Sequence, residues 1–243
     1  ANAPVPKFSE ATSDVIPLED RSRRKWDNAM VADLDRDGHQ DLVLTEHSLE
    51  AKVFWNDGGK FSAPQTLVRG DTHGVAAGNY DQDGLMDLIV YHGGGGGKNP
   101  RNPIVFHVSR RAIEGGEEFA DFVRSRGRAV KLVDADGDGL LDLVTTAFPL
   151  ASQKDVGANY LYHNAGDGRF EFVRNLPGTP FMSFRALVTD FNNDGTPDLI
   201  LYGGGRMTAL QGGSGMDFSD VTDKVLGPLA GTGYVSSIAE VDY

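Results

Sequence analysis

The chain has 243 residues, 40% of which are hydrophobic, so it holds enough apolar material for one large or two small globular domains. Its 35 acidic and 23 basic residues leave a formal net charge of -12, which argues against nucleic acid or an anionic membrane as the main partner. Cysteine is absent, which excludes disulfides and thiolate metal sites, and no apolar run approaches the roughly 18–20 residues that membrane insertion requires.

The N-terminal segment "ANAPVP" lacks an initiator Met, as a chain trimmed after export would. We therefore expect a secreted, periplasmic or cell-surface protein. The stretch "PKFSEATSDV" (6–15) is similar to "MDFSDVTDKV" (216–225) near the other end of the chain. Both stretches are expected to be outer-strand segments of repeated units.

An acidic loop recurs along the chain. "DLDRDGHQDL" is followed by "NYDQDGLMDL", "DADGDGLLDL" and "DFNNDGTPDL", and each copy has oxygen-bearing side chains at positions 1, 3, 5 and 9, Gly at 6 and Leu at 10. The four loops occupy residues 33–41, 79–87, 134–142 and 190–198. A truncated fifth copy is expected at 236–243, where "SSIAEVDY" aligns Asp242 with the first loop position.

The segments around each loop predict short strands. An apolar run precedes the loop, and a β-rich run such as "DLVLTE" and a third run such as "YLYHN" follow it. A Phe then opens the last segment of each unit, at Phe61, Phe119, Phe170 and Phe218. Four strands per unit of about 50 residues, without a helical period, predict an all-β propeller of four-stranded blades that takes in residues 1–243.

The spacing inside the loops favours a calcium site. Ca²⁺ takes six to eight oxygen ligands, and alternate side chains of a tight loop converge on one point when a glycine permits the turn. A helical calcium hand would need Glu at position 12, where Leu44 and Thr145 stand in the first and third loops. An ordinary polar turn, which also uses Asp, Asn and Gly, is the alternative.

The repeated DxDxDGxxDL loops resemble the FG-GAP/VCBS repeats of integrin α-chain propellers and of many secreted bacterial proteins. The segments "LYHNAGDGRFEFV" and "FSDVTDKV" resemble more narrowly the acidic cartilage protein and UnbV branch. This resemblance implies about four structural Ca²⁺ ions, each in the loop that joins the first two strands of a blade. Because the family usually has seven blades, it also implies part of a larger propeller that a second chain or a further segment completes.

The ligands that the resemblance implies come from positions 1, 3, 5 and 9, with a backbone carbonyl at position 7. They are Asp33, Asp35, Asp37, His39 and Asp41 in the first loop; Asn79, Asp81, Asp83, Leu85 and Asp87 in the second; Asp134, Asp136, Asp138, Leu140 and Asp142 in the third; and Asp190, Asn192, Asp194, Thr196 and Asp198 in the fourth. Asn79 and Asn192 replace a carboxylate, so the second and fourth loops are expected to bind Ca²⁺ more weakly.

The face opposite the calcium loops is the expected ligand site, because the longer and more variable loops lie there. Its candidate ligand-binding residues are Trp26, Asp27, His47, His73, Tyr91, His92, Arg128, Phe148 and Arg185. Aromatic and bidentate polar groups suit a glycan, and a protein ligand is also open. The "RGD" at 69–71 is short enough to occur by chance, and we give it no function.

Two other functions stay open. A polysaccharide lyase would use His73 or His92 as the base and Arg128 or Arg185 against a uronate carboxylate. A purely structural repeat domain would use none of them. The sequence has no nucleophile elbow or HExxH motif, which favours a binding module over an enzyme.

Overall fold

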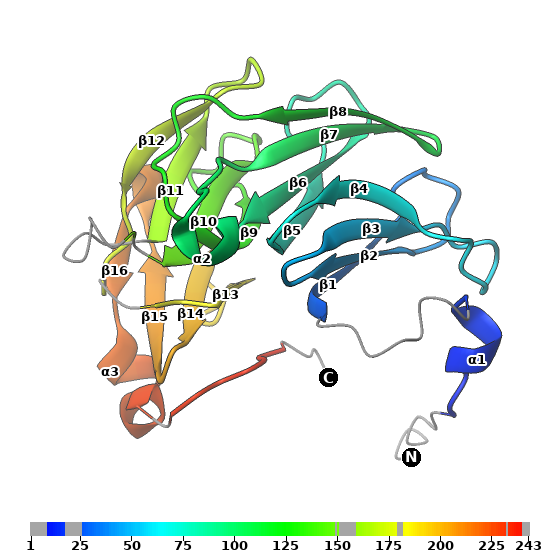
Figure 1. Cartoon of the computed structure of the whole chain (residues 1–243). Helices are drawn as coiled ribbons and strands as arrows, with labels where there is room; N and C mark the ends of the chain where they lie inside the picture. Colours follow the sequence, from blue (N-terminus) through cyan, green and yellow to red (C-terminus); the bar gives the residue numbers. More distant parts are fainter. Residues whose placement is uncertain are drawn as a thin grey trace, which may run out of the picture.

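The structure is a computed structural model, which describes residues 9–17, 26–148, 150, 159–178, 182–231 and 233–239. In this part of the chain four antiparallel sheets of four strands form the blades of a propeller (Figure 1). The predicted all-β fold is confirmed.

Each blade is a meander whose strands follow chain order from the centre outward. Blade 1 contains β1 (Trp26–Ala32), β2 (Asp41–Glu46), β3 (Glu50–Phe54) and β4 (Gln65–Arg69). Blade 2 contains β5 (Thr72–Gly78), β6 (Met86–His92), β7 (Ile104–Ser109) and β8 (Ala112–Glu118). Blade 3 contains β9 (Arg126–Val133), β10 (Asp142–Phe148), β11 (Asn159–Asn164) and β12 (Phe170–Asn175). Blade 4 contains β13 (Arg185–Thr189), β14 (Asp198–Gly203), β15 (Arg206–Gly212) and β16 (Phe218–Asp220).

The hydrophobic core lies between the blades, in three clusters. Because successive side chains of a strand point to opposite faces, β6 can contribute to two clusters at once. Leu88 and Val90 pack toward blade 1, whereas Ile89 and Tyr91 pack toward blade 3. A third cluster joins blades 3 and 4. This two-sided burial explains why the second strands read as nearly continuous apolar runs.

The strand register separates two faces of the propeller. In blade 1, Ala32 pairs with Asp41 at the end that carries the acidic loop, and Trp26 pairs with Glu46 at the other end. The acidic loops and the hairpins between third and fourth strands therefore share one face. The turns between second and third strands and the connectors between blades share the other face, which we call the connector face.

The inner strands of consecutive blades pack side by side: β1 against β5, β5 against β9 and β9 against β13. The C-terminal segment, red in Figure 1, runs from blade 4 toward blade 1. Residues 234–239 carry no strand, and Asp242 of the expected fifth copy lies outside the described residues. The predicted fifth inner strand is therefore not found in the part that is described.

Short helices account for two further differences. The segments expected as outer strands contain α1 (Thr12–Val15) and α3 (Thr222–Val225). In the second segment a strand, β16, precedes the helix, whereas residues 6–8 of the first lie outside the described residues. The described residues also contain the short helices α2 (Gly94–Gly97), η3 (Ser214–Met216) and η4 (Gly227–Gly231). Across the described residues, no helix has the length and apolar sequence needed to cross a membrane.

The expectation that a Phe opens each fourth strand is correct for blades 3 and 4. Phe119, in contrast, follows β8, because the tight turn at Arg110 starts this strand directly after β7. Phe61 lies before β4 and forms an isolated bridge with Asn56.

Candidate functional site

The four acidic loops share one pattern of hydrogen bonds. The position-6 glycine N–H donates to the position-1 side chain, at 3.0 Å from Gly38 to Asp33 and 2.9 Å from Gly195 to Asp190. The position-7 N–H donates to the position-5 carboxylate at 2.7–2.8 Å in every loop. The glycine φ lies between 85° and 90° in all four copies, a left-handed conformation that favours glycine. Each loop is thus folded so that its acidic side chains turn inward.

The position-9 aspartate connects each loop to the rest of its blade. In loop 3, Asp142 has no exposed surface, and it accepts the N–H of Ala135 and the N–H of Asn164, both at 2.9 Å. Asp41 and Asp198 do the same in loops 1 and 4. This aspartate therefore joins the loop to the third strand of the blade.

The oxygen atoms in these loops suit a hard cation. Three carboxylates converge within 4.8 Å in loop 1, at Asp33, Asp35 and Asp37, and in loop 3, at residues 134, 136 and 138. Burial raises the pKa of Asp87 to about 6 despite the hydrogen bond from His107. A bound cation would offset this penalty on the charged form. The residues present therefore fit Ca²⁺, with the second and fourth loops supplying one carboxylate fewer.

Blades 2 and 3 add a histidine to the loop. His107 Nδ1 lies 2.7 Å from Asp87 Oδ1, and His163 Nδ1 lies 3.1 Å from Asp142 Oδ1. Neither histidine was expected from the sequence, because each comes from the third strand. The signal in the sequence was a histidine directly after three apolar residues in each of these strands.

Loop 1 already contacts a cationic side chain. Arg111, from the β7–β8 hairpin of blade 2, donates to Asp35 at 2.7 Å, to Asp37 at 3.3 Å and to Asp57 at 2.6 Å. These contacts tie blade 2 to the acidic loop of blade 1. They also place a positive charge beside two expected Ca²⁺ ligands.

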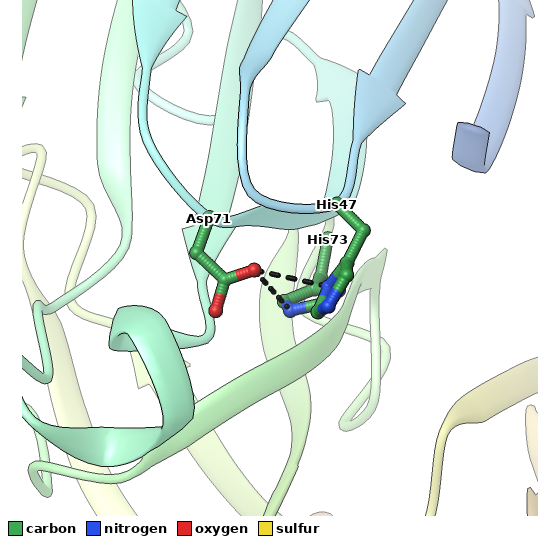
Figure 2. Close-up of side chains that lie close together, drawn as sticks. All are labelled: His47, Asp71 and His73. Atoms are coloured by element: carbon green, nitrogen blue, oxygen red, sulfur yellow. Dashed lines mark ion pairs between the residues drawn. The ribbon is translucent and has the colours of Figure 1, made fainter. Parts of the chain in front are cut away.

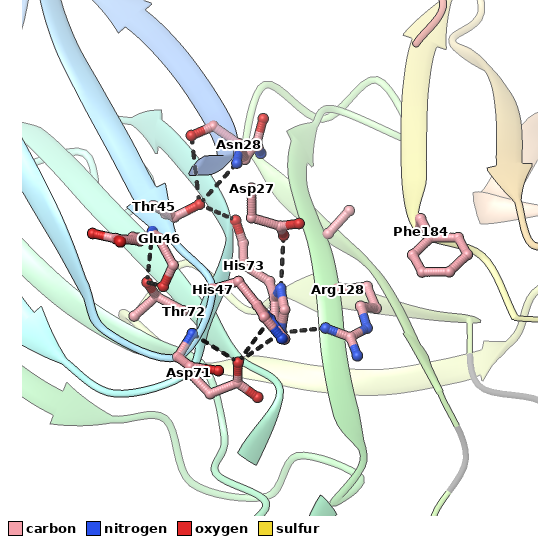
Figure 3. Close-up of polar contacts among 12 residues, drawn as sticks. Asp27, Asn28, Thr45, Glu46, His47, Asp71, Thr72, His73, Arg128 and Phe184 are labelled. Atoms are coloured by element: carbon pink, nitrogen blue, oxygen red, sulfur yellow. Dashed lines mark hydrogen bonds and ion pairs between the residues drawn. The ribbon is translucent and has the colours of Figure 1, made fainter. Parts of the chain in front are cut away.

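The connector face gathers charged side chains from three blades around His73 (Figure 3). His73 is 1% exposed, with Nδ1 2.7 Å from Asp27 Oδ2 and Nε2 3.2 Å from Asp71 Oδ1. His47, in the β2–β3 turn, lies 3.0 Å from the same Asp71 oxygen. The ends of β1, β2 and β5 thus bring two carboxylates and two imidazoles together.

Electrostatics hold both carboxylates in the charged form. Burial alone would raise the pKa of Asp27, but the hydrogen bond from His73 and the charge of Arg185 outweigh it and lower the pKa to about 2. Burial of Asp71 is likewise outweighed by the charge of His73 and the hydrogen bond from Gly95, so its pKa lies below its usual range.

Two arginines complete the cluster. Arg128 contacts His73 Nε2, and its guanidinium carbon lies 4.4 Å from the centre of the Phe148 ring. Arg185 contacts the backbone oxygen of Asp27 and lies 3.3 Å from its carboxylate, which links blade 4 to blade 1.

A cavity of about 280 Å³ opens beside Asp71. Its lining includes Arg69, His92 and Arg101. His92 is 2% exposed and its Nε2 has no hydrogen-bond partner among the described residues. Burial and the nearby charge of Arg101 lower the pKa of His92 to about 4, so the ring is neutral at physiological pH.

The remaining candidates have different positions. Tyr91 is fully buried in the core between blades 2 and 3, where its hydroxyl lies 2.7 Å from Ser125 Oγ, so it is not placed to touch a ligand. The side chain of Trp26 lies outside the described part. Asp71 was missed as a site residue because the sequence showed it only within the "RGD" tripeptide.

The chain is similar to a curated protein and to several solved structures. Integrin alpha-PS5 of Drosophila melanogaster is 37% identical over 92 residues, which are 35% of this chain and 9% of the integrin. A lectin of Agrocybe aegerita that recognises non-reducing terminal N-acetylglucosamine matches with a TM-score of 0.52 at 19% identity, over 84% of this chain and 55% of that chain. A BBS1N chain solved in complex with ARL6DN matches with a TM-score of 0.48 at 14% identity, over 82% of this chain and 61% of that chain. The chain thus spans only part of each relative's length.

A sequence model described as the FG-GAP-like repeat matches residues 8–90 and 134–201, which is more than half of the chain. The matched ranges contain all four acidic loops, at 33–41, 79–87, 134–142 and 190–198. Repeat spacing, blade topology and loop geometry agree with this match, and the chain belongs to the FG-GAP-like repeat family.

Proposed function

We propose that the protein is a calcium-stabilised extracellular binding module that takes an anionic glycan on its connector face. The ligand site is inferred from the cluster around His73 together with the adjoining cavity. Buried charged groups are costly, and a group of them at the mouth of a cavity is a common mark of a functional site.

Calcium has a structural role in this proposal. The four loops repeat by blade, whereas a catalytic site is usually single, and each loop lies between the first and second strands of its blade. A cation held there would fasten these two strands at one end. The resemblance to integrin α-chain propellers supports both the choice of Ca²⁺ and a location outside the cell or in the periplasm.

The cavity supports an acidic sugar as the ligand. Arg69 is exposed, and no carboxylate among the described side chains pairs with it. Arg101 also lines the cavity, although it shares its charge with Glu118 at 2.7 Å. Guanidinium groups recognise carboxylates and sulfates, so two of them at one cavity favour an acidic sugar.

A glycan array tests the ligand. The full chain in calcium is applied to uronate-containing, sulfated and neutral glycans, and we expect binding to the acidic classes that falls at least roughly tenfold in Arg69→Ala. The matched control is Arg169→Ala, on the β11–β12 hairpin at the opposite face. Failure of all acidic glycans to bind, or equal loss in both variants, would reject the proposal.

The geometry does not favour the lyase alternative. A general base has to reach the proton that it removes, and His73 and His92 are only 1% and 2% exposed. His73 is also engaged on both ring nitrogens. We therefore propose a binding function and no second activity.

We further infer that a second chain or another segment completes a larger ring. Blade 4 reaches blade 1 through Arg185, and a cavity of about 380 Å³ lies between Asp27 and Ser236 at this seam. Packing an additional strand or blade there would cover it. Light scattering of the chain tests this inference, because a compact monodisperse monomer would count against it.

A further inference from the structure

His47, Asp71 and His73 bring two imidazole nitrogens and one carboxylate oxygen to a single point (Figure 2). Asp71 Oδ1 lies 3.0 Å from His47 Nδ1 and 3.2 Å from His73 Nε2, and the three atoms lie within 4.8 Å of one another. In a tetrahedral site with bonds of about 2.0–2.1 Å, neighbouring ligand atoms are about 3.3 Å apart. The two distances to Asp71 match this spacing.

The other side of His73 orients the ring for metal binding. Its Nδ1 lies 2.7 Å from the Asp27 carboxylate, which can only accept a hydrogen bond when ionised. In the deprotonated ring, which is the form that binds a metal, the lone pair is then on Nε2, which faces the Asp71 oxygen. The lone pairs on His73 Nε2 and Asp71 Oδ1 therefore favour a cation between these two atoms. A carboxylate on the far nitrogen of a histidine is the usual outer support of a metal ligand.

Arg128 supplies a cation at this position. One guanidinium nitrogen contacts His73 Nε2, while Nε of the same side chain has no hydrogen-bond partner among the described residues. Arg128 is 7% exposed and lies over the Phe148 ring. Its guanidinium and a metal ion would therefore compete for the same lone pair.

We propose that His47, Asp71 and His73 bind a divalent transition metal of the zinc class, in competition with Arg128. Two nitrogen ligands and one carboxylate favour such metals over Ca²⁺ and Mg²⁺, which prefer all-oxygen sites. The His47 side chain is 44% exposed, so the remaining coordination positions open toward solvent and can take water or a ligand oxygen. The site is distinct from the calcium loops and does not depend on glycan binding.

The test isolates this cluster from the other histidines. The chain has six histidines, and His107 and His163 lie beside acidic loops that could also hold zinc. The parent for the experiment is therefore the full chain with His107→Ala and His163→Ala, in saturating calcium. Equilibrium dialysis measures bound zinc, and the visible spectrum of bound Co²⁺ reports nitrogen coordination. We expect one zinc ion per chain.

Two variants of this parent decide the outcome. His47→Ala, in a half-exposed turn where loss of folding is not at issue, should lower zinc affinity at least roughly tenfold, because one of three ligands is lost. Leu49→Ala, at an exposed position of the same β2–β3 turn that offers no metal-binding side chain, is the matched control and should bind like the parent. No zinc bound to the parent, or equal affinity in the two variants, would overturn the metal site.

A third variant tests the competition. Arg128→Met keeps the stem of the side chain over Phe148 but removes its charge, so zinc affinity should rise roughly tenfold or more. Affinity that is unchanged or lower would overturn the competing role of Arg128.

Discussion

Replacing Asp142 separates the structural part of an acidic loop from its metal-binding part. The carboxylate is fully buried and accepts two backbone N–H groups at 2.9 Å. Asp142→Ala leaves both donors buried without a partner, and each such group costs about 1–3 kcal/mol. We expect the free energy of unfolding to fall by about 2–5 kcal/mol in chelator, and by more in calcium, because Asp142 is also an expected Ca²⁺ ligand. For a chain of this size each kcal/mol corresponds to a melting-temperature shift of about 2–4 °C.

Asp138→Ala is the matched control in the same loop. Asp138 is exposed, and its contact within the loop is the N–H of Leu140 at 2.8 Å. In a chelator the variant should therefore differ from the wild type by less than about 0.5 kcal/mol. In calcium it should lose part of the stabilisation that the wild type gains from the ion.

The assay is denaturant unfolding of wild type, Asp142→Ala and Asp138→Ala, each in chelator and in excess calcium. If the free energy of unfolding of Asp142→Ala equalled that of the wild type, the reasoning from buried hydrogen bonds would be refuted. If Asp138→Ala gained as much from calcium as the wild type does, the calcium assignment of loop 3 would be wrong.

Three further predictions concern other parts of the molecule. Gly74→Ala should lower the free energy of unfolding, measured with denaturant, by about 1–3 kcal/mol, because the new Cβ would lie 2.8 Å from a backbone nitrogen of β9. Gly231→Ala, with open space around it, is the neutral control. His92 has a pKa of about 4 in the folded protein, below its usual value, so the folded state disfavours protonation and stability falls as pH drops from 6.5 toward 4. In urea titrations at several pH values, His92→Leu should lose up to about 3 kcal/mol less stability than the wild type over this pH range. If the free energy of unfolding fell equally with pH in both proteins, this prediction would be contradicted. Arg111→Ala should raise the calcium affinity of loop 1 in calorimetry, because a competing charge is removed, while Arg110→Ala should not; equal effects would argue against the contact.

The acidic loops and the blades could be predicted because their signals are local. Oxygen-bearing residues at alternate positions, with a glycine at a left-handed turn, define each loop within nine residues. The strands on either side follow from apolar runs that repeat every 50 or so residues. The fold class, the place of the loops between first and second strands, and the separation of two faces all came from this pattern.

Contacts between blades could not be predicted from such local patterns. Arg111 lies 76 residues from Asp35, and nothing in either segment marks them as partners. The outer strand of blade 2 was misplaced in part for a related reason, because the turn at Arg110 and not the following Phe119 starts it. Tyr91 looked like a surface aromatic, but the alternation of β6 directs it into the core.

The sequence by itself determined that this protein is a repeat of four-stranded blades with oxygen-rich loops, since both properties depend on neighbours along the chain. Asp27, His73 and Arg128 each lie six residues before an acidic loop, so the repeat also places them at equivalent positions of successive inner strands. Only the tertiary structure decided that Asp71 joins them and that His47 faces the same oxygen. These contacts depend on how blades 1 and 2 pack around the centre, which brings two imidazoles to one carboxylate oxygen although no local spacing relates them.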